Sequence, residues 1–512
     1  MDLTRALLKN TKVANYLMSH VSPKTHAKRG EQYALKTLSA AVNRTTAYPD
    51  FLADKGVRLS ANPTMSEFAQ LPLTSKPDYI DRYSLDQLCL DGKLTCGYSV
   101  ERSSGHSGGT YYWLRLPEED ELFPAYLEFA AVQWFRVHER SSLVLVTLSL
   151  GTWTSGEKYA QGMREIAASG RYTMSVMSPG SNLEEVLEIV GDLGSFYDQI
   201  IVIGYPPFVK TILDEGVRRG IDWPSHNLKI AVGGEGYSEQ WRDHVARMIG
   251  VDPSTDLLSV TGGYGAADLG LSVGREYPIT VMIRKLCSAD PDLAEALFPD
   301  TRGHHSTLPS LLQYNPAMYY LESIGGELAF TVFSGIPLVR YVIGDSGGIM
   351  PFDEMLRIVS EHGHDPVADL AKLGYGAEHV WKMPFFWVHG RSDGTVSIMG
   401  ANVFPENIQA ILAEANDRDV CTFKLKVETL ADVSQRLVVS IEYAADELGE
   451  ERETALSAHY YELIVEGLRR INADFRQSHD ENPEAADPIV RVHARGTGPF
   501  AERPRIKNRY VE

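Results

Sequence analysis

The sequence predicts an α/β protein with a large N-terminal domain, built from βα units around a mainly parallel sheet, and a small mobile α+β C-terminal domain. Apolar strand-like runs alternate with helical segments between residues 123 and 261, which is the pattern of βαβ units. Near residue 390 a charged, glycine-flanked turn interrupts the chain, and the pattern changes after it. Because 512 residues exceed what one hydrophobic core usually serves, we expect domains at residues 1–389 and 390–512.

The regular part of the N-terminal domain is expected to begin at residue 123, after a helical and irregular segment that prolines interrupt. Helices are expected at Phe123–His138, Glu157–Ala168, Leu183–Leu193, Pro207–Arg219 and Glu239–Ile249. Strands are expected at Leu143–Leu150, Tyr172–Met177, Gln199–Ile203, Leu228–Val232, Leu257–Thr261, Glu327–Ser334 and Leu338–Ile343. Ligands of such sheets bind beyond the carboxyl ends of the strands, so the glycine-rich loops after Val232 and Thr261 are candidate binding loops.

The C-terminal domain is expected to begin with the tight turn at Asp393-Gly394, because glycine tolerates the positive φ of such turns. A strand at Thr395–Met399 is broken by Gly400, and Pro405 then begins a helix. The later elements are strands at Thr422–Glu428, Leu437–Tyr443 and Ile489–His493 and an amphipathic helix over residues 453–472. The turn is typical of a hinge between domains, although an ordinary surface hairpin has the same pattern.

Charge and composition restrict the partners. A formal net charge of −19, without a long basic run, argues against a nucleic-acid-binding protein. No apolar run approaches the about 20 residues that cross a bilayer, and the first residues lack a signal-peptide pattern. The four cysteines show no CxxC pair, which fits a reducing compartment and no structural zinc. We expect a cytoplasmic protein whose partner is a small molecule or another protein.

The segment Ser103–Thr110 collects hydroxyl groups and glycines between two strand-like flanks. Backbone N–H groups and hydroxyls of such a loop can surround a triphosphate, because no bulky side chain prevents close approach. The segment lacks the Gly-Lys-Ser/Thr ending of a P-loop NTPase, which excludes that family. By itself it fits a surface loop equally well.

Three further segments carry groups suited to a nucleotide. The glycines of Gly233–Gly236 can lie along a flat ring, and Tyr264 can stack on one. Asp268 offers a hard oxygen ligand for Mg²⁺ beside phosphates. Asp345 can accept hydrogen bonds from both hydroxyls of a ribose, at what is expected to be the end of a strand. Each segment also fits an ordinary turn between elements.

In this order, the motifs resemble those of the ANL adenylate-forming superfamily, and in particular its phenylacetate–CoA ligase branch. The superfamily is named for acyl-CoA synthetases, nonribosomal peptide adenylation domains and luciferase. The similar segments are Leu71–Lys76 (an early Leu-Pro-hydroxyl-Lys signature), Ser103–Thr110 (phosphate loop), Gly233–Glu235 (nucleotide-edge motif), Tyr264–Asp268 (Tyr-Gly-x-x-Glu), Arg340–Asp345 (Arg-Tyr-x-x-Gly-Asp), and Gly390–Asp393 with Asn402–Pro405 (hinge and first C-terminal segment).

The resemblance implies ATP and Mg²⁺ as cofactors and assigns site residues. Asp268 is implied as a catalytic residue and Mg²⁺ ligand, Asp393 as the hinge, and Lys507 as the catalytic lysine, with Arg505 and Arg509 as rivals for its role. The implied ATP- or AMP-binding residues are Ser103, Ser104, Gly105, His106, Ser107, Gly108, Gly234, Glu235, Gly263, Tyr264, Gly265, Asp345 and Arg391.

Four departures from the family pattern stand out. His106 replaces a hydroxyl residue, the customary lysine of the phosphate loop is absent, Asp268 stands where glutamate is usual, and the C-terminal Gly-Lys signature is missing.

The implied reaction is adenylation of a small organic carboxylic acid, aromatic acids included, with release of pyrophosphate, followed by acyl transfer to CoA. Two alternatives keep the adenylation step but change the acceptor. In the first, an amine accepts the activated group, so that the enzyme is an amide- or N–N-bond-forming ligase, with nitrite as a further candidate for activation. In the second, a carrier protein accepts the acyl group. A third is a catalytically inactive adenylate-binding regulator, which the altered phosphate loop suggests. The sequence does not determine the oligomeric state, and a homodimer is one of the alternatives.

Overall fold

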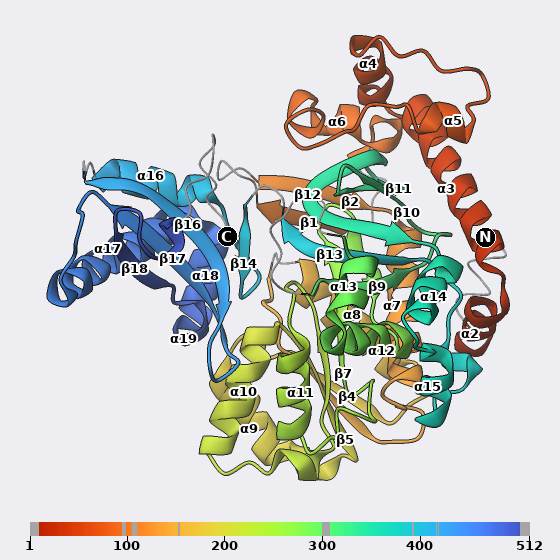
Figure 1. Cartoon of the computed structure of the whole chain (residues 1–512). Helices are drawn as coiled ribbons and strands as arrows, with labels where there is room; N and C mark the ends of the chain where they lie inside the picture. Colours follow the sequence, from red (N-terminus) through yellow and green to blue (C-terminus); the bar gives the residue numbers. More distant parts are fainter. Residues whose placement is uncertain are drawn as a thin grey trace.

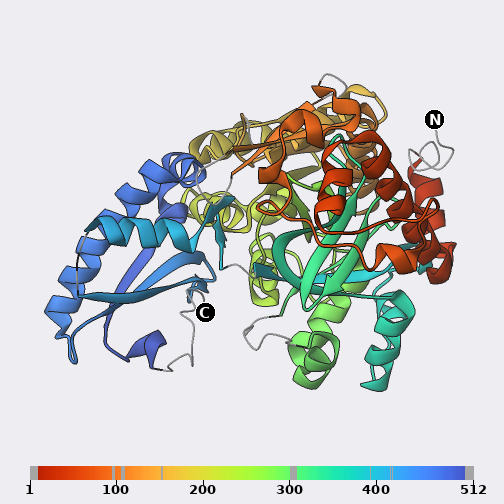
Figure 2. The same cartoon turned by 90° about the horizontal axis from the view of Figure 1, so that it is seen from above.

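The structure is a computed structural model that describes residues 10–94, 99–104, 110–151, 154–299, 308–391, 394–415, 417 and 419–501. A large body holds the elements up to β13, and a smaller body holds those from β14 onward (Figure 1). The two bodies lie side by side in two perpendicular views (Figures 1 and 2). No helix of the described residues combines the length and apolarity needed to cross a membrane.

One sheet of eleven strands forms the centre of the large body, in the order β10-β11-β12-β13-β9-β8-β7-β6-β5-β3-β4. Its parallel part confirms the five strands expected from the βαβ pattern. These strands are β3 (Ser142–Val146), β4 (Met174–Met177), β5 (Gln199–Gly204), β6 (Lys229–Val232) and β7 (Val260–Ala266). The predicted α/β fold class is confirmed.

The second part of the sheet is antiparallel and contains strands that the sequence did not predict. Its strands are β8 (Gly270–Arg275), β9 (Ser310–Tyr314), β10 (Tyr320–Ile324), β11 (Glu327–Val332), β12 (Leu338–Met350) and β13 (Phe385–Arg391). Two predictions were wrong here. Gly262–Ala266 is not a turn but the end of β7, which pairs with β8. Asp345 does not end its strand, because β12 continues beside β13 to Met350.

Helices cover the large body. Those expected between the parallel strands are confirmed within a few residues: α8 (Thr154–Ala168), α9 (Leu183–Leu193), α10 (Pro206–Arg218) and α11 (Glu239–Met248). The expected helix at residues 123–138 instead runs from Pro117 to Gln133, as α7. It begins earlier because Pro117 suits a first helical turn and because Glu119 accepts a hydrogen bond from the Leu116 N–H at 2.7 Å.

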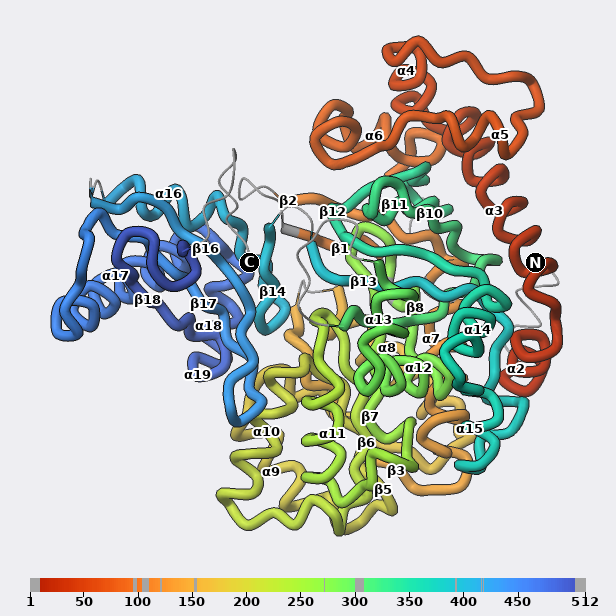
Figure 3. Tube along the Cα trace, in the orientation of Figure 1, coloured from red at the N-terminus to blue at the C-terminus, as the bar shows by residue number. Residues whose placement is uncertain are grey.

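The other helices of the large body are α2 (Thr11–His20), α3 (Pro23–Arg44), α4 (Ala47–Asp54), α5 (Met65–Phe68), α6 (Leu85–Leu88), α12 (Pro278–Ala289), α13 (Pro291–Leu297), α14 (Phe352–Glu361) and α15 (Pro366–Lys372). The trace in Figure 3 places α3 on the side of the molecule opposite the smaller body. Two strands, β1 (Ser99–Ser104) and β2 (Thr110–Arg115), form a separate antiparallel hairpin.

The smaller body has a three-stranded sheet of β16 (Val420–Thr429), β17 (Gln435–Tyr443) and β18 (Ile489–Ala494). Its helices are α16 (Pro405–Ala415), α17 (Glu450–Ile471), α18 (Ala473–Glu481) and α19 (Pro483–Ala486). The amphipathic helix predicted over residues 453–472 is confirmed as α17, because Tyr460, Ile464 and Leu468 on one of its faces are buried. The single strand expected before Gly400 is instead a hairpin of β14 (Val396–Ile398) and β15 (Ala401–Val403). Met399 and Gly400, both with positive φ, form its turn.

Candidate active site

A cavity of about 760 Å³ lies where the glycine-rich segment after β6 and the glycine-rich end of β7 meet β12, β13 and the β14–β15 hairpin. Several of the site residues expected from the sequence line it together: Ser103, Gly234, Glu235, Gly263, Tyr264, Gly265, Asp268, Asp345 and Arg391. Others fall outside the described residues, namely Gly105, His106, Ser107, Gly108, Asp393, Lys507 and its rivals Arg505 and Arg509. Of Ser104 the structure describes the backbone, in β1 opposite Thr110.

Asp345 is the centre of one polar group in the cavity. Its carboxylate accepts a hydrogen bond from the Tyr264 hydroxyl, and an Arg391 nitrogen lies 4.0 Å from its other oxygen. The register of β12 and β13, which places Asp345 opposite Arg391, brings these two side chains together. The ring of Tyr264 stacks on Phe330, at 6.1 Å between centroids. Burial and the nearby Asp345 carboxylate raise the pKa of Tyr264, so the tyrosine stays a hydrogen-bond donor.

Asp268 is the centre of a second polar group, in the turn between β7 and β8. Its side chain is buried, and Oδ2 accepts a hydrogen bond from the Tyr341 hydroxyl at 2.8 Å. Lys76 Nζ lies 3.2 Å from the same oxygen and 4.9 Å from the centre of the Tyr111 ring. The sequence placed Lys76 in a motif but not in the site.

The donor set around Asp268 bears on Mg²⁺ binding. Both contacts, from Lys76 and from Tyr341, go to Oδ2. Within the described part of the chain, no three His, Cys, Asp or Glu side chains are close enough to form a metal cage. Mg²⁺ in nucleotide sites is commonly held by one or two carboxylates together with phosphates and water. The residues present therefore fit a metal that arrives with ATP better than one bound by protein alone.

A buried ionic network, which the sequence did not predict, lies beside the cavity and is hydrogen-bonded to the backbone of β7. Glu276 accepts hydrogen bonds from the Gly262 N–H at 2.7 Å and from the Tyr237 hydroxyl at 2.5 Å. Arg242 donates to the other oxygen of Glu276 at 2.6 Å. Although burial opposes ionisation, this arginine lowers the pKa of Glu276 below its usual value. The network therefore connects α11 to the backbone of β7 beside the cavity.

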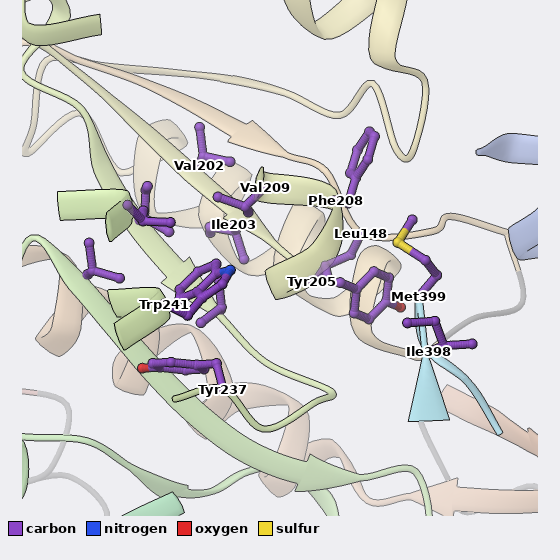
Figure 4. Packing of buried hydrophobic residues seen from close by; sticks show 14 of the residues in the cluster. Leu148, Val202, Ile203, Tyr205, Phe208, Val209, Tyr237, Trp241, Ile398 and Met399 are labelled. Carbon is purple, nitrogen blue, oxygen red and sulfur yellow. The ribbon is translucent and has the colours of Figure 1, made fainter. Parts of the chain in front are cut away.

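Glu235 connects the two bodies. Its Oε1 accepts a hydrogen bond from the Gly400 N–H, in the turn of the β14–β15 hairpin, at 2.8 Å. The ring of Tyr205 packs between Gly234 and Gly400, where an added Cβ would come within 2.9 Å and 2.6 Å of the ring. Figure 4 shows Tyr205 beside Met399. Burial raises the pKa of Glu235 to about 8.

We expect the contact between Glu235 and the hairpin to weaken as the pH rises. The carboxyl keeps its proton up to about pH 8 in this arrangement but titrates near its usual 4.5 when exposed. The raised pKa therefore leaves the contact at full strength below about pH 4.5, and the contact weakens progressively up to about pH 8. Amide hydrogen exchange at Met399 and Gly400 should show protection falling over this range.

Glu235→Gln is the matched control, because the amide oxygen can still accept from Gly400 but does not titrate. The ratio of protection factors between wild type and Glu235→Gln removes the intrinsic pH dependence of exchange. The same pH dependence in both proteins would contradict this role of Glu235.

No family model matches the chain. Known proteins match it in sequence and, separately, in structure. In sequence, the chain is 23% identical over 366 residues to a phenylacetate–coenzyme A ligase of Aromatoleum evansii, covering 70% of this chain and 69% of the relative. It is also 23% identical over 385 residues to a phenylacetate–coenzyme A ligase of Pseudomonas putida, covering 73% and 72%. The chain resembles ANL adenylate-forming ligases. The resemblance predicted from the motifs is thereby confirmed.

One solved structure has the same fold over nearly the whole chain. A 2-hydroxyisobutyryl-CoA ligase, solved with 2-HIB-AMP and CoA in the thioesterification state, matches with a TM-score of 0.57 at 13% identity. The match covers 96% of this chain and 89% of that one. It therefore extends over both bodies of this chain and shows that the two proteins share a fold.

Proposed function

We propose that the protein activates a small organic carboxylic acid with ATP, releases pyrophosphate and then transfers the acyl group to CoA. The proposal rests on one observation: the same cavity is lined by Asp345, by Asp268 and by the glycine-rich segments that follow β6 and end β7. This arrangement suits a nucleotide, because Asp345 can bind ribose hydroxyls while the glycines admit a flat base. The family resemblance supplies the type of reaction.

In the first step a carboxylate oxygen attacks the α-phosphorus of ATP. The bond from that phosphorus to the bridging oxygen breaks, and its electron pair leaves with pyrophosphate. The acyl group then carries AMP, a far better leaving group than hydroxide. The protein contributes alignment and charge neutralisation. Lys76 and Arg391 are the described cations that line the cavity near the two carboxylates.

A Mg²⁺ ion, when bound, would neutralise phosphate charge, and Asp268 is the residue that would hold it. The proposed division at residue 390 makes residues 390–512 a mobile unit, with Asp393 as its hinge. Rotation about this hinge would withdraw Lys507 and admit the acceptor. The contacts of Glu235 and Tyr205 with the β14–β15 hairpin are then contacts that rotation would break.

ATP–pyrophosphate exchange over a panel of carboxylic acids, with nitrite included, tests the first step. Product analysis with CoA, amines and a carrier protein then distinguishes the acceptors. Exchange with no acid, while ATP still binds, would contradict catalysis and favour the inactive regulator. Exchange without a thioester, but with an amide or N–N product, would replace CoA by an amine as the acceptor.

Asp345→Ala is expected to weaken ATP binding by about 2–3 kcal/mol, because it removes charge-assisted hydrogen bonds to ribose. Isothermal calorimetry measures the change directly. Asp353→Ala, an exposed aspartate at the start of α14, is the control and should bind ATP as wild type does. Unchanged affinity in a folded Asp345→Ala protein would remove Asp345 from the nucleotide site.

A further inference from the structure

Arg275, the last residue of β8, differs from the other buried arginines of the described chain. It is 8% exposed and lines the large cavity. The buried arginines Arg115, Arg242, Arg284 and Arg340 each form an ion pair with at least one glutamate. Among the described residues, no carboxylate pairs with Arg275. Because an unpaired buried charge is costly, this guanidinium indicates a site where a ligand supplies the negative charge.

The contacts of Arg275 hold its side chain in place without neutralising it. Its Nη2 donates to Ser272 Oγ at 2.8 Å, and the guanidinium lies 5.6 Å from the centre of the Trp134 ring. A hydroxyl and an aromatic face orient a planar guanidinium while leaving several N–H groups for an anion. Ser272 also lines a second cavity of about 330 Å³, together with Tyr126 and Met318. Arg275 therefore sits close to where the two cavities approach each other.

The strand register places Arg275 away from the end of the cavity that carries Asp268. Arg275 is opposite Gly263, whereas the tip of the β7–β8 hairpin begins at the pair Ala266–Gly270. Three residues of a strand correspond to about 10 Å. Arg275 lies on the cavity side of the sheet, since a Cβ on Gly263 would meet Arg275 Cγ at 3.8 Å. The cavity thus has Asp268 and Lys76 near the tip of the β7–β8 hairpin, and farther along the hairpin it has Arg275, which no described carboxylate pairs with.

We propose that Arg275 binds a second anionic group of the substrate acid, distant from the carboxylate that is activated. The inference rests on the proposed function and specifies its substrate class: short dicarboxylic acids, or acids with another terminal oxyanion. The reacting carboxylate would point toward Asp268, where the phosphates are expected. Arg275 is the less suitable partner for that group, because a close guanidinium would reduce the nucleophilicity of the attacking oxygen. At the distal end a bidentate pair fixes orientation without this effect.

Matched pairs of acids test the proposal in two measurements. In ATP–pyrophosphate exchange, glutarate is compared with pentanoate and terephthalate with benzoate. Wild type should prefer the dicarboxylate in at least one pair, by about 10²-fold in kcat/KM, because the monocarboxylate leaves Arg275 buried and unpaired. In thermal unfolding, the preferred dicarboxylate should raise the Tm of wild type more than its monocarboxylate partner does.

Arg275→Met keeps the approximate volume and removes the charge. It should lose the preference in both measurements, lowering kcat/KM for the dicarboxylate about 10²-fold while leaving the monocarboxylate within a few-fold. Arg275→Lys should retain part of the preference. Since no carboxylate in the described part of the chain pairs with Arg275, the Met variant should unfold at a Tm no lower than that of wild type, which separates loss of binding from loss of fold.

The outcomes distinguish this inference from the proposed function. A preference of wild type for monocarboxylates, or an equal loss for both acids of each pair in Arg275→Met, overturns the role of Arg275 while adenylation stands. A charge-dependent Tm shift with dicarboxylates, but no exchange with any acid, supports the role of Arg275 and overturns adenylation.

Discussion

Replacing Lys507 with alanine is expected to slow adenylation by about 10²-fold or more, while transfer from a pre-made acyl adenylate continues at nearly the wild-type rate. A cation stabilises the charge that develops around the α-phosphate only while that charge is forming. Once the adenylate exists, the proposed rotation has moved the C-terminal unit away. ATP–pyrophosphate exchange measures the first step, and single turnover of a synthetic acyl adenylate with CoA measures the second.

Asp393→Pro is expected to have the opposite effect, since the proline ring restricts φ at the proposed hinge. Adenylation should persist while transfer to CoA is impaired. Arg505→Ala and Arg509→Ala are the controls that test which residue supplies the cation. If either variant slows adenylation strongly, that arginine and not Lys507 is the catalytic cation. Equal slowing of both steps by Lys507→Ala and by Asp393→Pro would contradict a rotating C-terminal unit.

The parallel part of the sheet could be predicted because its strands are short, apolar and separated by amphipathic helices. In the antiparallel part, the predictions of β11 and of the start of β12 are confirmed, whereas β8 and the second half of β12 were not predicted. The glycines of these two segments explain why. A Cβ on Gly274 would come within 2.2 Å of the Phe386 ring, and one on Gly348 within 2.2 Å of the Trp387 ring. These glycines make room for aromatic side chains of β13 inside the sheet. A single sequence shows them as breaks, because their partners are more than thirty residues away.

The candidate site shows the same limit. Residues in continuous motifs, such as Tyr264 and Asp345, could be identified, and the fold brings them into contact. Their pairing with each other, and that of Lys76 with Asp268, depends on which strands and loops are neighbours. Arg275 belongs to no motif. That no described carboxylate pairs with it is a property of its surroundings in the folded chain, which a single sequence does not show.

Arg242→Met is expected to lower the free energy of unfolding by about 3–5 kcal/mol, the effect of breaking a buried ion pair by removing one partner. Arg242 donates to Glu239 at 3.0 Å, to Glu276 at 2.6 Å and to the Val260 carbonyl at 2.6 Å. Methionine fills much of the space but leaves two buried carboxylates with less neutralising charge. Denaturant unfolding with a fluorescence readout from Trp241, in the same helix, measures the loss.

Two methionine variants separate the buried network from a general effect of losing an arginine. Arg247 is on the same helix, and its guanidinium is exposed and 3.7 Å from an Asp243 oxygen, so Arg247→Met should change stability by less than about 0.5 kcal/mol. Arg275→Met also removes a buried guanidinium, at 8% exposure against 2% for Arg242, but one with no carboxylate partner among the described residues, and should not destabilise the free protein. A similar loss in Arg242→Met and Arg275→Met would show that packing, rather than charge pairing, determines the stability of these sites. A large loss in Arg242→Met alone would show that the ionic network stabilises the backbone of Gly262 and, with it, the wall of the cavity.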